Sequence, residues 1–552
     1  MKKTVFAKLS FFAIFTGALA LAFTSCSSLT KAEDVFVTPD YTEKDILENE
    51  KRQIEKIAEE HPVEALWRAR LSGDQETITN YEKALLEKLD KAYSGGNFLD
   101  AWRYYLSLEE ASSELLKEYL EKKNISQTLL YRDFLKEVPS FNLSKEDLAL
   151  LPKTIDDCVN ATVTIWVDKG IKIENGIGYA DRVLGSGFFI DTRGYIVTNN
   201  HVISDLVDPK YESYTRLYIK LAKDQETRIP AKVIGYDQTL DLALLKAEIT
   251  PPFILRLGSS SDLKTGDKVS AIGTPLGLYG TVTTGIVSAV GRKLFTTGSV
   301  LQIDAAVNSG NSGGPCIDSE MKVQAVVFAG ILQYQGLNFA IPVEYLKQDL
   351  PFLYAGGKRR QVWTGSFGHT FKNGVKESGL EVQYVMPGES AFRSGLKKGD
   401  VITGLFGRKV NNLEDFQDIL RSFTDETLLK VTFDREGKEK EALLYLSERP
   451  EHPGYEFYKS DIIQNSFIPI FGMELTPAST VSSRKFTISD IIKGSVADES
   501  GFSVTDPVTV TEVDFTDKKE AIYTSLSTRK KKKGYLDISI RIANQTDSPY
   551  YF

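Results

Sequence analysis

The segment from Gly310 to Pro315 constrains this 552-residue chain more than any other, because it reads Gly-Asn-Ser-Gly-Gly-Pro. Glycines on both sides of Ser312 let the backbone turn tightly, so that main-chain N–H groups can point at an atom bound to the serine. A serine hydroxyl becomes a nucleophile when a base takes its proton and donors stabilise the oxyanion that forms. The segment therefore indicates a catalytic serine, and an ordinary glycine-rich loop is the alternative.

The base for such a serine has to come from only four histidines. Three of them lie outside the β-rich stretch that contains Ser312, namely His61, His369 and His452. His201 lies within that stretch and follows a strand-like run that ends at Val197. Because histidine takes up and releases protons near neutral pH, His201 is the expected general base of Ser312.

Asp241 is the expected partner of His201. It is a lone acid inside the apolar run Thr239 to Leu245, where a carboxylate is costly to bury unless another group pairs with it. A carboxylate in this role holds the imidazole in the tautomer that can accept a proton from serine. The chain order His201, Asp241, Ser312 is that of chymotrypsin-type proteases, and not of subtilisins or α/β-hydrolases.

Three motifs in this order together resemble the HtrA (DegP/DegS-like) serine proteases: TNNHVI at 198–203, DLALLK at 241–246 and GNSGGP at 310–315. A fourth stretch, GLNFAIP at 336–342, resembles the segment that closes the protease domain of that family. The resemblance implies that Ser312 is the nucleophile. It also implies that His201 is the general base and acid, and Asp241 the orienting carboxylate.

The resemblance also assigns an oxyanion hole to the same loop. The backbone N–H groups of Gly310 and Ser312 would form it, with Asn311 between them. One departure is visible, because Ser309 stands where the family commonly has proline. That exchange removes no catalytic group, but it leaves the resting geometry of the loop open.

Composition narrows the class of protein. A hydrophobic content of 42% and a charged content of 26% are typical of a soluble globular protein, and a net charge of −8 argues against nucleic-acid binding. No Cys/His cluster has metal-ligand spacing, so no metal or cofactor is expected. Cys158 and Cys316 are expected to be buried free thiols, with a disulfide between them as the alternative.

The first 26 residues resemble a secretory signal, with Lys2 and Lys3 before an apolar run from Leu9 to Phe23. Two cleavage sites compete. Ala18-Leu19-Ala20 suits an ordinary signal peptidase, whereas Phe23-Thr24-Ser25-Cys26 resembles a relaxed bacterial lipobox in which Cys26 becomes the acylated N-terminus. Either site predicts export to the periplasm or cell envelope, and the second predicts a membrane anchor through Cys26.

The rest of the chain divides into four regions. Residues 27–152 have apolar positions three and four apart, which predicts helices. Within them Ala92–Trp102 resembles one TPR-type hairpin, and a helical bundle or spacer is the alternative. Residues 153–354 are expected to form a chymotrypsin-like double β-barrel protease domain. A PDZ domain at 360–449 and a degenerate PDZ-like domain at 460–546, both α+β, complete the predicted multidomain fold.

Two motifs carry the resemblance to PDZ domains. Pro387–Ile402 matches the core of the domain, and Ser378–Val382 resembles its carboxylate-binding loop. In such domains an extended peptide pairs with an open sheet edge and its C-terminal carboxylate rests on backbone N–H groups. The expected peptide-binding residues are Gly379, Leu380, Glu381 and Val382. A helix from Leu413 to Ser422 would line the other side of the groove, and a β-roll without a ligand is the alternative.

The second domain repeats this plan only in part. Ile492–Phe502 resembles Met386–Leu396, but the Gly-Asp-Val-Ile step that follows in the first domain is replaced by Ser503–Pro507. The stretch Gly356–Arg360 is expected to be a linker between the protease and PDZ domains.

These residues predict an exported serine endopeptidase of HtrA type that degrades unfolded or misassembled cell-envelope proteins. Its PDZ domain would bind C-terminal peptides for substrate recruitment or activation. The resemblance implies a trimer-based homo-oligomer. The alternative, of a different class, is a latent or inactive protease that acts as a peptide-binding chaperone or scaffold.

Overall fold

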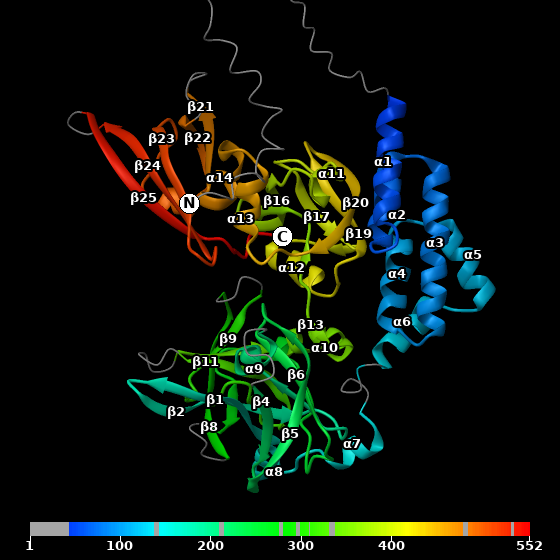
Figure 1. Ribbon diagram of the computed structural model, residues 1–552, viewed down its shortest axis with the longest axis vertical. Helices are drawn as coiled ribbons and strands as arrows, with labels where there is room; N and C mark the ends of the chain where they lie inside the picture. Colours follow the sequence, from blue (N-terminus) through cyan, green and yellow to red (C-terminus); the bar gives the residue numbers. More distant parts are fainter. Residues whose placement is uncertain are drawn as a thin grey trace, which may run out of the picture. The chain divides into compact units, whose positions relative to one another are not determined.

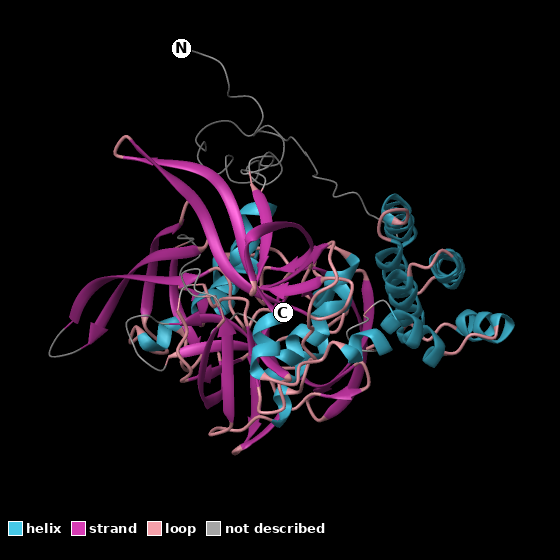
Figure 2. Cartoon of the chain, turned by 90° about the horizontal axis from the view of Figure 1, so that it is seen from below, coloured by secondary structure: helices cyan, strands magenta, loops and turns pink. Residues whose placement is uncertain are grey.

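The computed structural model describes residues 43–136, 138, 143–208, 215–274, 280–293, 298–308, 310–330, 337–478, 484–531 and 535–552. The predicted signal segment with Cys26, and also Ser309, lie outside these residues. The chain divides into two units, Met1–Glu50 and Lys51–Phe552, and apart from the first residues of the helix Glu43–Ile57 the elements below belong to the second. Helices predominate before residue 160 and strands after it (Figure 1, Figure 2). None of the described helices is long and apolar enough to cross a bilayer.

The helical region owes its boundaries to local capping. Its helices are α1 (Glu43–Ile57), α2 (Pro62–Ser72), α3 (Gln75–Ser94), α4 (Phe98–Glu110), α5 (Glu114–Lys123) and α6 (Gln127–Lys136). Helix α2 begins at a proline, whose missing N–H would have no helical partner there, and ends before Gly73, which has a φ of 72°. The side chains of Asp74 and Asn97 accept hydrogen bonds from Thr77 and Asp100 N–H groups, which caps α3 and α4.

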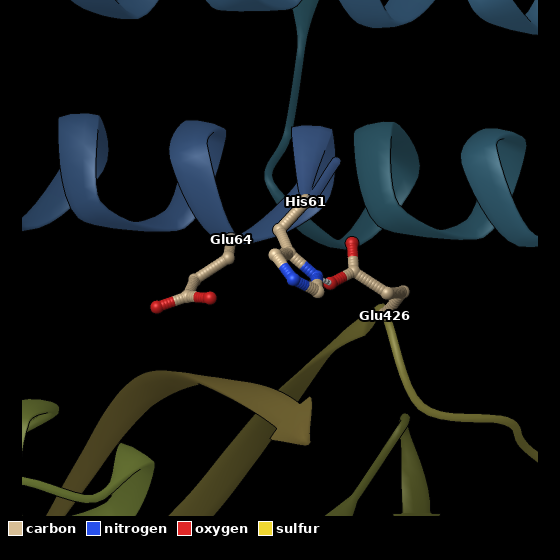
Figure 3. A group of neighbouring side chains, drawn as sticks. All are labelled: His61, Glu64 and Glu426. Atoms are coloured by element: carbon tan, nitrogen blue, oxygen red, sulfur yellow. Dashed lines mark hydrogen bonds and ion pairs between the residues drawn. The ribbon is translucent and has the colours of Figure 1, made fainter. Parts of the chain in front are cut away.

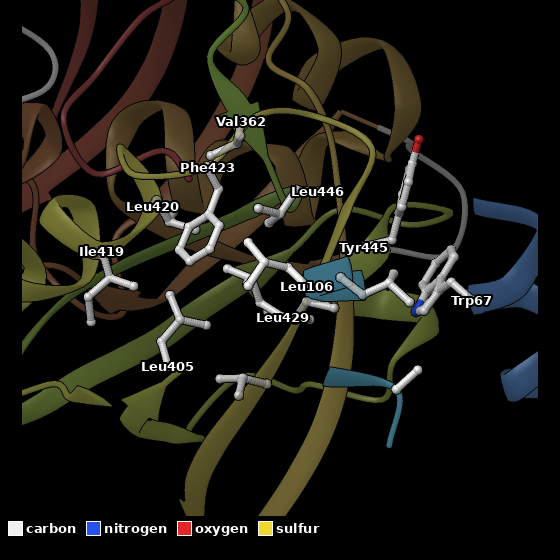
Figure 4. Close-up of a cluster of buried hydrophobic side chains, with 14 of the residues drawn as sticks. Trp67, Leu106, Val362, Leu405, Ile419, Leu420, Phe423, Leu429, Tyr445 and Leu446 are labelled. Atoms are coloured by element: carbon white, nitrogen blue, oxygen red, sulfur yellow. The ribbon is translucent and has the colours of Figure 1, made fainter. Parts of the chain in front are cut away.

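The helical region shares one hydrophobic core with the first PDZ domain (Figure 4). Trp67 of α2 stacks on Tyr445 with ring centroids 5.6 Å apart, and its Nε1–H donates to the carbonyl of Leu443 at 2.8 Å. Leu106 of α4 packs in the same cluster as Leu429. Because buried side chains of both regions belong to this one cluster, the helical region is a structural part of the PDZ unit, and not a free spacer.

The protease domain consists of two closed β-barrels, as the resemblance implied. The first contains β1 (Thr162–Glu174), β2 (Ile177–Phe189), β3 (Tyr195–Thr198), β4 (Arg216–Leu221), β5 (Asp224–Asp237) and β6 (Leu242–Ala247). The second contains β7 (Lys268–Gly273), β8 (Thr281–Arg292), β9 (Val300–Ile303), β10 (Pro315–Ile317), β11 (Val323–Gly330) and β12 (Asn338–Pro342). Pairing of β5 with β6 closes the first barrel, and β10 with β7 the second, which leaves few unpaired strand edges.

Three short helices and one longer one flank the barrels. They are α7 (Lys145–Ala149), α8 (Ile155–Asn160), α9 (Asn200–Val207) and α10 (Val343–Ala355). Helix α9 follows directly on β3 and carries the predicted general base. Helix α10 closes the domain and packs against β5 and β6 of the first barrel.

The first PDZ domain is one sheet with a helix over its open side. Its elements are β14 (Val362–Trp363), β15 (Ser366–Asn373), β16 (Lys376–Val385), α11 (Ser390–Arg393), β17 (Val401–Leu405), β18 (Arg408–Lys409), α12 (Leu413–Leu420), β19 (Thr427–Arg435) and β20 (Lys438–Glu448). The strand order is β14-β20-β19-β17-β16-β15, so that β15 lies at an edge and β16 in the interior.

The turn Ser503–Asp506 of the second PDZ-like domain has the same hydrogen bond as the turn Lys397–Asp400 of the first, although the two sequences differ. The elements of this second domain are α13 (Pro453–Ser460), α14 (Ile463–Phe471), β21 (Met473–Pro477), β22 (Lys485–Ile491), α15 (Val496–Glu499), β23 (Pro507–Phe515), β24 (Ala521–Lys531) and β25 (Tyr535–Gln545). The carboxylate of Asp506 accepts from Ser503 N–H at 2.8 Å, as that of Asp400 accepts from Lys397 N–H at 2.8 Å. Residues 516–520 join β23 to β24 without a counterpart of α12, so this domain lacks the helix that would line a peptide groove.

The predicted linker is packed. Gly357–Lys358 forms β13, which pairs in parallel with β5, and Arg359 is only 5% exposed. One guanidinium nitrogen of Arg359 donates to the carbonyls of Arg421 and Phe423 at 3.0 and 2.6 Å, and Nε lies 3.6 Å from the buried carboxylate of Asp349. This arginine therefore joins α10 of the protease domain to the end of α12 in the PDZ domain.

Replacing Arg359 with glutamine is expected to lower the free energy of unfolding by about 3 kcal/mol, because Asp349 then stays buried without its cationic partner. The matched control is Arg360→Gln, which removes an ion pair to Asp425 from an arginine that is 52% exposed. Surface pairs of that kind contribute about 1 kcal/mol or less. Denaturant unfolding followed by fluorescence measures both variants. Equal small losses would contradict a special role for Arg359.

Candidate active site

The predicted pair of His201 and Asp241 is formed. Nδ1 of His201 lies 2.7 Å from Oδ2 of Asp241, and the backbone N–H of His201 donates to Oδ1 at 2.8 Å. Because a carboxylate only accepts, Nδ1 carries the hydrogen and Nε2 is left to take a proton. The imidazole side chain is 47% exposed and the Asp241 side chain 14%. The base is thus accessible to a substrate, whereas its orienting acid is shielded.

Asp241 is held by its own backbone conformation. It lies between β5 and β6 with a φ of 55°, in the left-handed region that non-glycine residues seldom adopt. Its carbonyl accepts from the side-chain amide of Asn199 at 2.8 Å and from the N–H of Asn200 at 3.2 Å. These bonds tie Asp241 to the two residues before His201, so that the acid and the base form one rigid group.

The loop of Ser312 requires its glycines. Gly310 has a φ of 102° and Gly313 a φ of 85°. A Cβ on Gly313 would lie 2.2 Å from the carbonyl oxygen of Ser186 and 3.0 Å from the backbone nitrogen of Asn199, so no side chain fits there. The same closeness places the loop of the second barrel directly against the segment that carries His201.

The two predicted oxyanion donors are unengaged. Among the residues that the structure describes, neither the N–H of Gly310 nor that of Ser312 donates to a protein acceptor. The N–H of Asn311, between them, donates to the carbonyl of Asn308 at 3.0 Å. Two free donors that flank an engaged one are what a site for a developing negative charge needs.

The hydroxyl of Ser312 does not contact His201. Its Oγ donates to the carbonyl of Phe328 at 3.1 Å, and within the described residues no hydrogen bond joins Ser312 to His201. The structure therefore places the predicted nucleophile and the predicted base on adjoining segments without the bond that would activate the serine. Rotation about the Cα–Cβ bond of Ser312 is needed before the hydroxyl can give its proton to Nε2.

Ser186 supports the loop, although no sequence motif predicted it. Its side chain is fully buried on β2, and Oγ donates to the carbonyl of Gly310 at 2.6 Å while accepting from the N–H of Thr274 at 3.0 Å. Its N–H donates to the carbonyl of Ser312 at 2.8 Å. The signal that could have found it is its position between two glycines, Gly185 and Gly187.

The prediction that Gly379–Val382 form the carboxylate-binding loop of the PDZ domain is wrong. Gly379, Leu380, Glu381 and Val382 lie within β16, between β15 and β17. The N–H of Gly379 donates to the carbonyl of Asn411 at 2.7 Å, and that of Val382 to the carbonyl of Asp400 at 2.8 Å. An interior strand has no open edge for a peptide, so these residues do not form a carboxylate site.

Both described cysteines are free and buried, so the alternative of a disulfide between them is not realised. Burial raises the pKa of Cys158 and of Cys316 to about 12. Since the thiolate is the nucleophilic form, neither side chain competes with Ser312 near neutral pH.

One group of side chains outside the triad brings together ligand-type atoms. Those of His61, Glu64 and Glu426 lie within 4.8 Å of one another (Figure 3). Each already has a protein partner: Nδ1 of His61 lies 2.6 Å from Oε1 of Glu426, and Glu64 pairs with Arg68 at 2.6 Å. The phenol of Tyr445 also donates to Glu426. The group thus ties α2 to the PDZ sheet by polar contacts, beside the stacked pair of Trp67 and Tyr445.

Comparison with known families accounts for the described domains. Residues 185–326 match a trypsin-like peptidase domain, residues 365–446 a PDZ domain, and residues 454–546 a TP0546 family PDZ domain. The chain is similar to HtrA/DegP-like proteins in its trypsin-like peptidase and PDZ domains. The prediction of a second, divergent PDZ domain in it is confirmed. Residues 45–129 match a domain of unknown function (DUF8517), and the interpretation as a TPR hairpin stays a prediction.

The DegP-like relatives match only part of this chain. A probable periplasmic serine endoprotease DegP-like of Bartonella henselae is 39% identical over 280 residues, which are 48% of this chain and 54% of the relative. A protein of the same name from Marinomonas sp. is 34% identical over 282 residues, which are 49% of this chain and 58% of that relative. The chain thus spans a little over half the length of the curated relatives it matches. The solved HtrA-type protease AlgW with a decapeptide aligns with a TM-score of 0.45 and 24% identity, over 55% of this chain and 98% of that one.

Proposed function

We propose that the chain is an exported serine endopeptidase of HtrA type that degrades unfolded or misassembled proteins of the cell envelope. One observation carries the proposal: the hydrogen-bonded pair of His201 and Asp241 on the first barrel lies against the Ser312 loop of the second, whose two flanking N–H groups have no acceptor in the described part of the chain. The names of the relatives, periplasmic DegP-like endoproteases, support both the reaction class and the compartment.

The proposed reaction is acyl transfer. Nε2 of His201 takes the proton of the Ser312 hydroxyl while Oγ attacks the scissile carbonyl carbon, and the carbonyl oxygen becomes an oxyanion. The N–H groups of Gly310 and Ser312 stabilise that oxyanion, with Asn311 between them. The imidazolium then gives its proton to the leaving amine, which leaves an acyl-enzyme. Water hydrolyses the acyl-enzyme with His201 again acting as the base.

A latent protease that acts as a peptide-binding chaperone or scaffold is the second candidate. The hydrogen bond from Ser312 Oγ to the carbonyl of Phe328 favours it, because the hydroxyl rests away from its base. In this form the chain would hold unfolded polypeptides without cleaving them. The two candidates differ in one property, which is whether Ser312 reacts as a nucleophile in the native chain.

Three further properties belong to the same proposal. The first PDZ domain would bind C-terminal peptides, through the edge of its sheet rather than through Gly379–Val382. The chain would form a trimer-based homo-oligomer through the protease domain. A lipid on Cys26 would anchor it to a membrane.

The experiment that tests the proposal is labelling with a fluorophosphonate, which reacts with a serine only when a base and an oxyanion hole are assembled. We expect mass spectrometry to find the adduct on Ser312, and pre-labelled chain to lose hydrolysis of unfolded casein. Absence of the adduct, with casein bound but uncleaved, would reject the endopeptidase in favour of the scaffold. Prior denaturation of the chain is the negative control.

A further inference from the structure

The segment Pro549–Phe552 lies along the open edge of the first PDZ sheet. The N–H of Ser366 donates to the main-chain oxygen of Phe552 at 2.7 Å, and the N–H of Phe552 donates back to the carbonyl of Ser366 at 2.9 Å. The N–H of Gly368 donates to the carbonyl of Tyr550 at 3.2 Å, and Phe367 and Tyr551 form an antiparallel bridge. The segment therefore continues the sheet beyond β15 as an added strand.

The side chain of Phe552 enters the space between that strand and α12. It is 3% exposed, and its ring meets that of Phe416 on α12 edge-on with centroids 4.9 Å apart. The side-chain amide of Gln417, also on α12, donates to the carbonyl of Pro549 at 2.5 Å. A small cavity beside the ring is lined in part by Val362 and Leu420. The segment is thus held from the strand side by backbone pairing, and from the helix side by the ring of Phe416 and the side-chain amide of Gln417.

Neighbouring side chains alternate, as in any strand. Tyr551 points the other way, into the core of the second domain, where its hydroxyl donates to the carbonyl of Pro469 at 3.1 Å and its ring meets Phe457. Tyr550 stacks on His369 of β15 with centroids 4.1 Å apart and is 37% exposed. Residues 549–552 therefore contact the groove through backbone and through Phe552, and the second domain through Tyr551.

The chain leading to the segment is fixed separately. The carbonyl of Thr546 accepts from the N–H of Gly454 at 2.7 Å, and a carboxylate oxygen of Asp547 lies 2.6 Å from the guanidinium of Arg449. These contacts hold the end of β25 beside the PDZ domain whether or not the last residues occupy the groove. The segment is therefore an intramolecular ligand, joined to the fixed end of β25 by only a few residues.

We propose that the groove between β15 and α12 is closed in cis by Pro549–Phe552, and that an external peptide enters it only when this segment leaves. The inference deepens the proposed peptide binding by the first PDZ domain and does not depend on the reactivity of Ser312. The external ligand is of the same chemistry as the occupant, an extended peptide with an aromatic side chain at the position of Phe552. Strand addition supplies its affinity and the pocket at Phe416 its specificity.

Tethering sets the size of the effect. A short linker gives the segment an effective concentration on the order of 1 mM at the groove. If the segment itself has a Kd of about 10 µM for the groove, it occupies the groove roughly a hundred times out of a hundred and one, and an external peptide then binds roughly a hundredfold more weakly than to the open groove. Loss of the Phe552 side chain weakens the occupant but leaves the strand edge and α12 intact.

The test uses the full chain and a fluorescent peptide with the sequence of residues 545–552, Gln-Thr-Asp-Ser-Pro-Tyr-Tyr-Phe. We expect Phe552→Ala to bind this probe at least about tenfold more tightly than the unchanged chain. Phe392→Ala removes an aromatic side chain that is 50% exposed on α11 of the same domain, and as the matched control it should bind like the unchanged chain. A probe with alanine in place of its last residue should bind neither chain.

Hydrogen exchange at the N–H groups of Ser366 and Gly368 gives a second readout that does not need probe binding. Both should exchange slowly in the unchanged chain, faster in Phe552→Ala, and slowly again when the probe is added. Equal, tight binding of the probe to both chains would overturn the closure in cis and leave peptide binding by the PDZ domain intact. Faster exchange in Phe552→Ala without any binding of the probe would overturn the inference together with the proposed peptide binding. Unchanged slow exchange in Phe552→Ala would also overturn the closure.

Discussion

Ser312→Ala is expected to reduce hydrolysis of unfolded casein by at least about a thousandfold, because it removes the only atom that can form the acyl-enzyme. The variant keeps His201, Asp241 and both free N–H groups, so that substrate binding should change little. The loss should therefore appear in kcat and leave KM nearly unchanged. The measurement is initial-rate release of peptides across a range of casein concentrations.

The structure offers controls for this substitution. Among the described residues the hydroxyl of Ser312 bonds to the carbonyl of Phe328 alone, so its loss should alter stability by about 1 kcal/mol or less. Ser319→Ala, at an exposed turn after β10, should retain full activity. If Ser312→Ala and the unchanged chain cleave casein equally fast, Ser312 is not the nucleophile. If both are inactive and no fluorophosphonate adduct forms, the scaffold is the better description.

Asp241→Asn is expected to lower casein hydrolysis at neutral pH by about ten-thousandfold, the size of effect known for the equivalent change in chymotrypsin-type enzymes. Asp241 accepts from both the backbone N–H and Nδ1–H of His201. An asparagine amide has one acceptor and one donor, so that with its oxygen on the backbone N–H it turns an NH₂ group toward Nδ1. The imidazole then carries its hydrogen on Nε2, where it cannot accept the proton of Ser312.

The pH profile separates this positioning role from simple unfolding. Activity of Asp241→Asn should rise with pH above neutrality, because hydroxide can take over the removal of the serine proton, while the unchanged chain levels off. Fluorophosphonate labelling should slow in parallel with hydrolysis. Asp262→Asn, which changes an exposed acid in the same domain, should leave both readouts unaltered. Full activity of Asp241→Asn at neutral pH would show that another group orients His201.

The candidate catalytic residues could be predicted because their signals are local. Gly310 and Gly313 had to be glycines for a turn that the structure confirms, with φ values of 102° and 85°. Asp241 was recognisable as a lone acid in an apolar run, and it proves to be bonded twice to His201. The helix predicted from Leu413 to Ser422 corresponds to α12, which ends at Leu420. In each case residues close in the chain impose either the backbone conformation or the energetic cost of burying a charge, and the pattern can therefore be recognised in the sequence.

The peptide-binding edge could not be predicted in the same way. The alternation of Gly379–Val382 describes a half-buried strand, and it is the same for an edge strand and an interior one. Only the strand order of the complete sheet places β16 inside and β15 at the edge. The error in the predicted carboxylate loop therefore follows from a property that belongs to the sheet and not to the segment.

The sequence by itself determined which residues can perform chemistry and which kinds of element surround them, because turns, caps and alternation depend on residues close in the chain. The tertiary structure decided four things that depend on distant partners. Ser312 rests on the carbonyl of Phe328, Ser186 supports its loop, Trp67 joins the helical region to the PDZ core, and Phe552 fills the groove beside α12. Each is a contact across more than ten residues of sequence, where packing and sheet order, and not local preference, set which side chains meet.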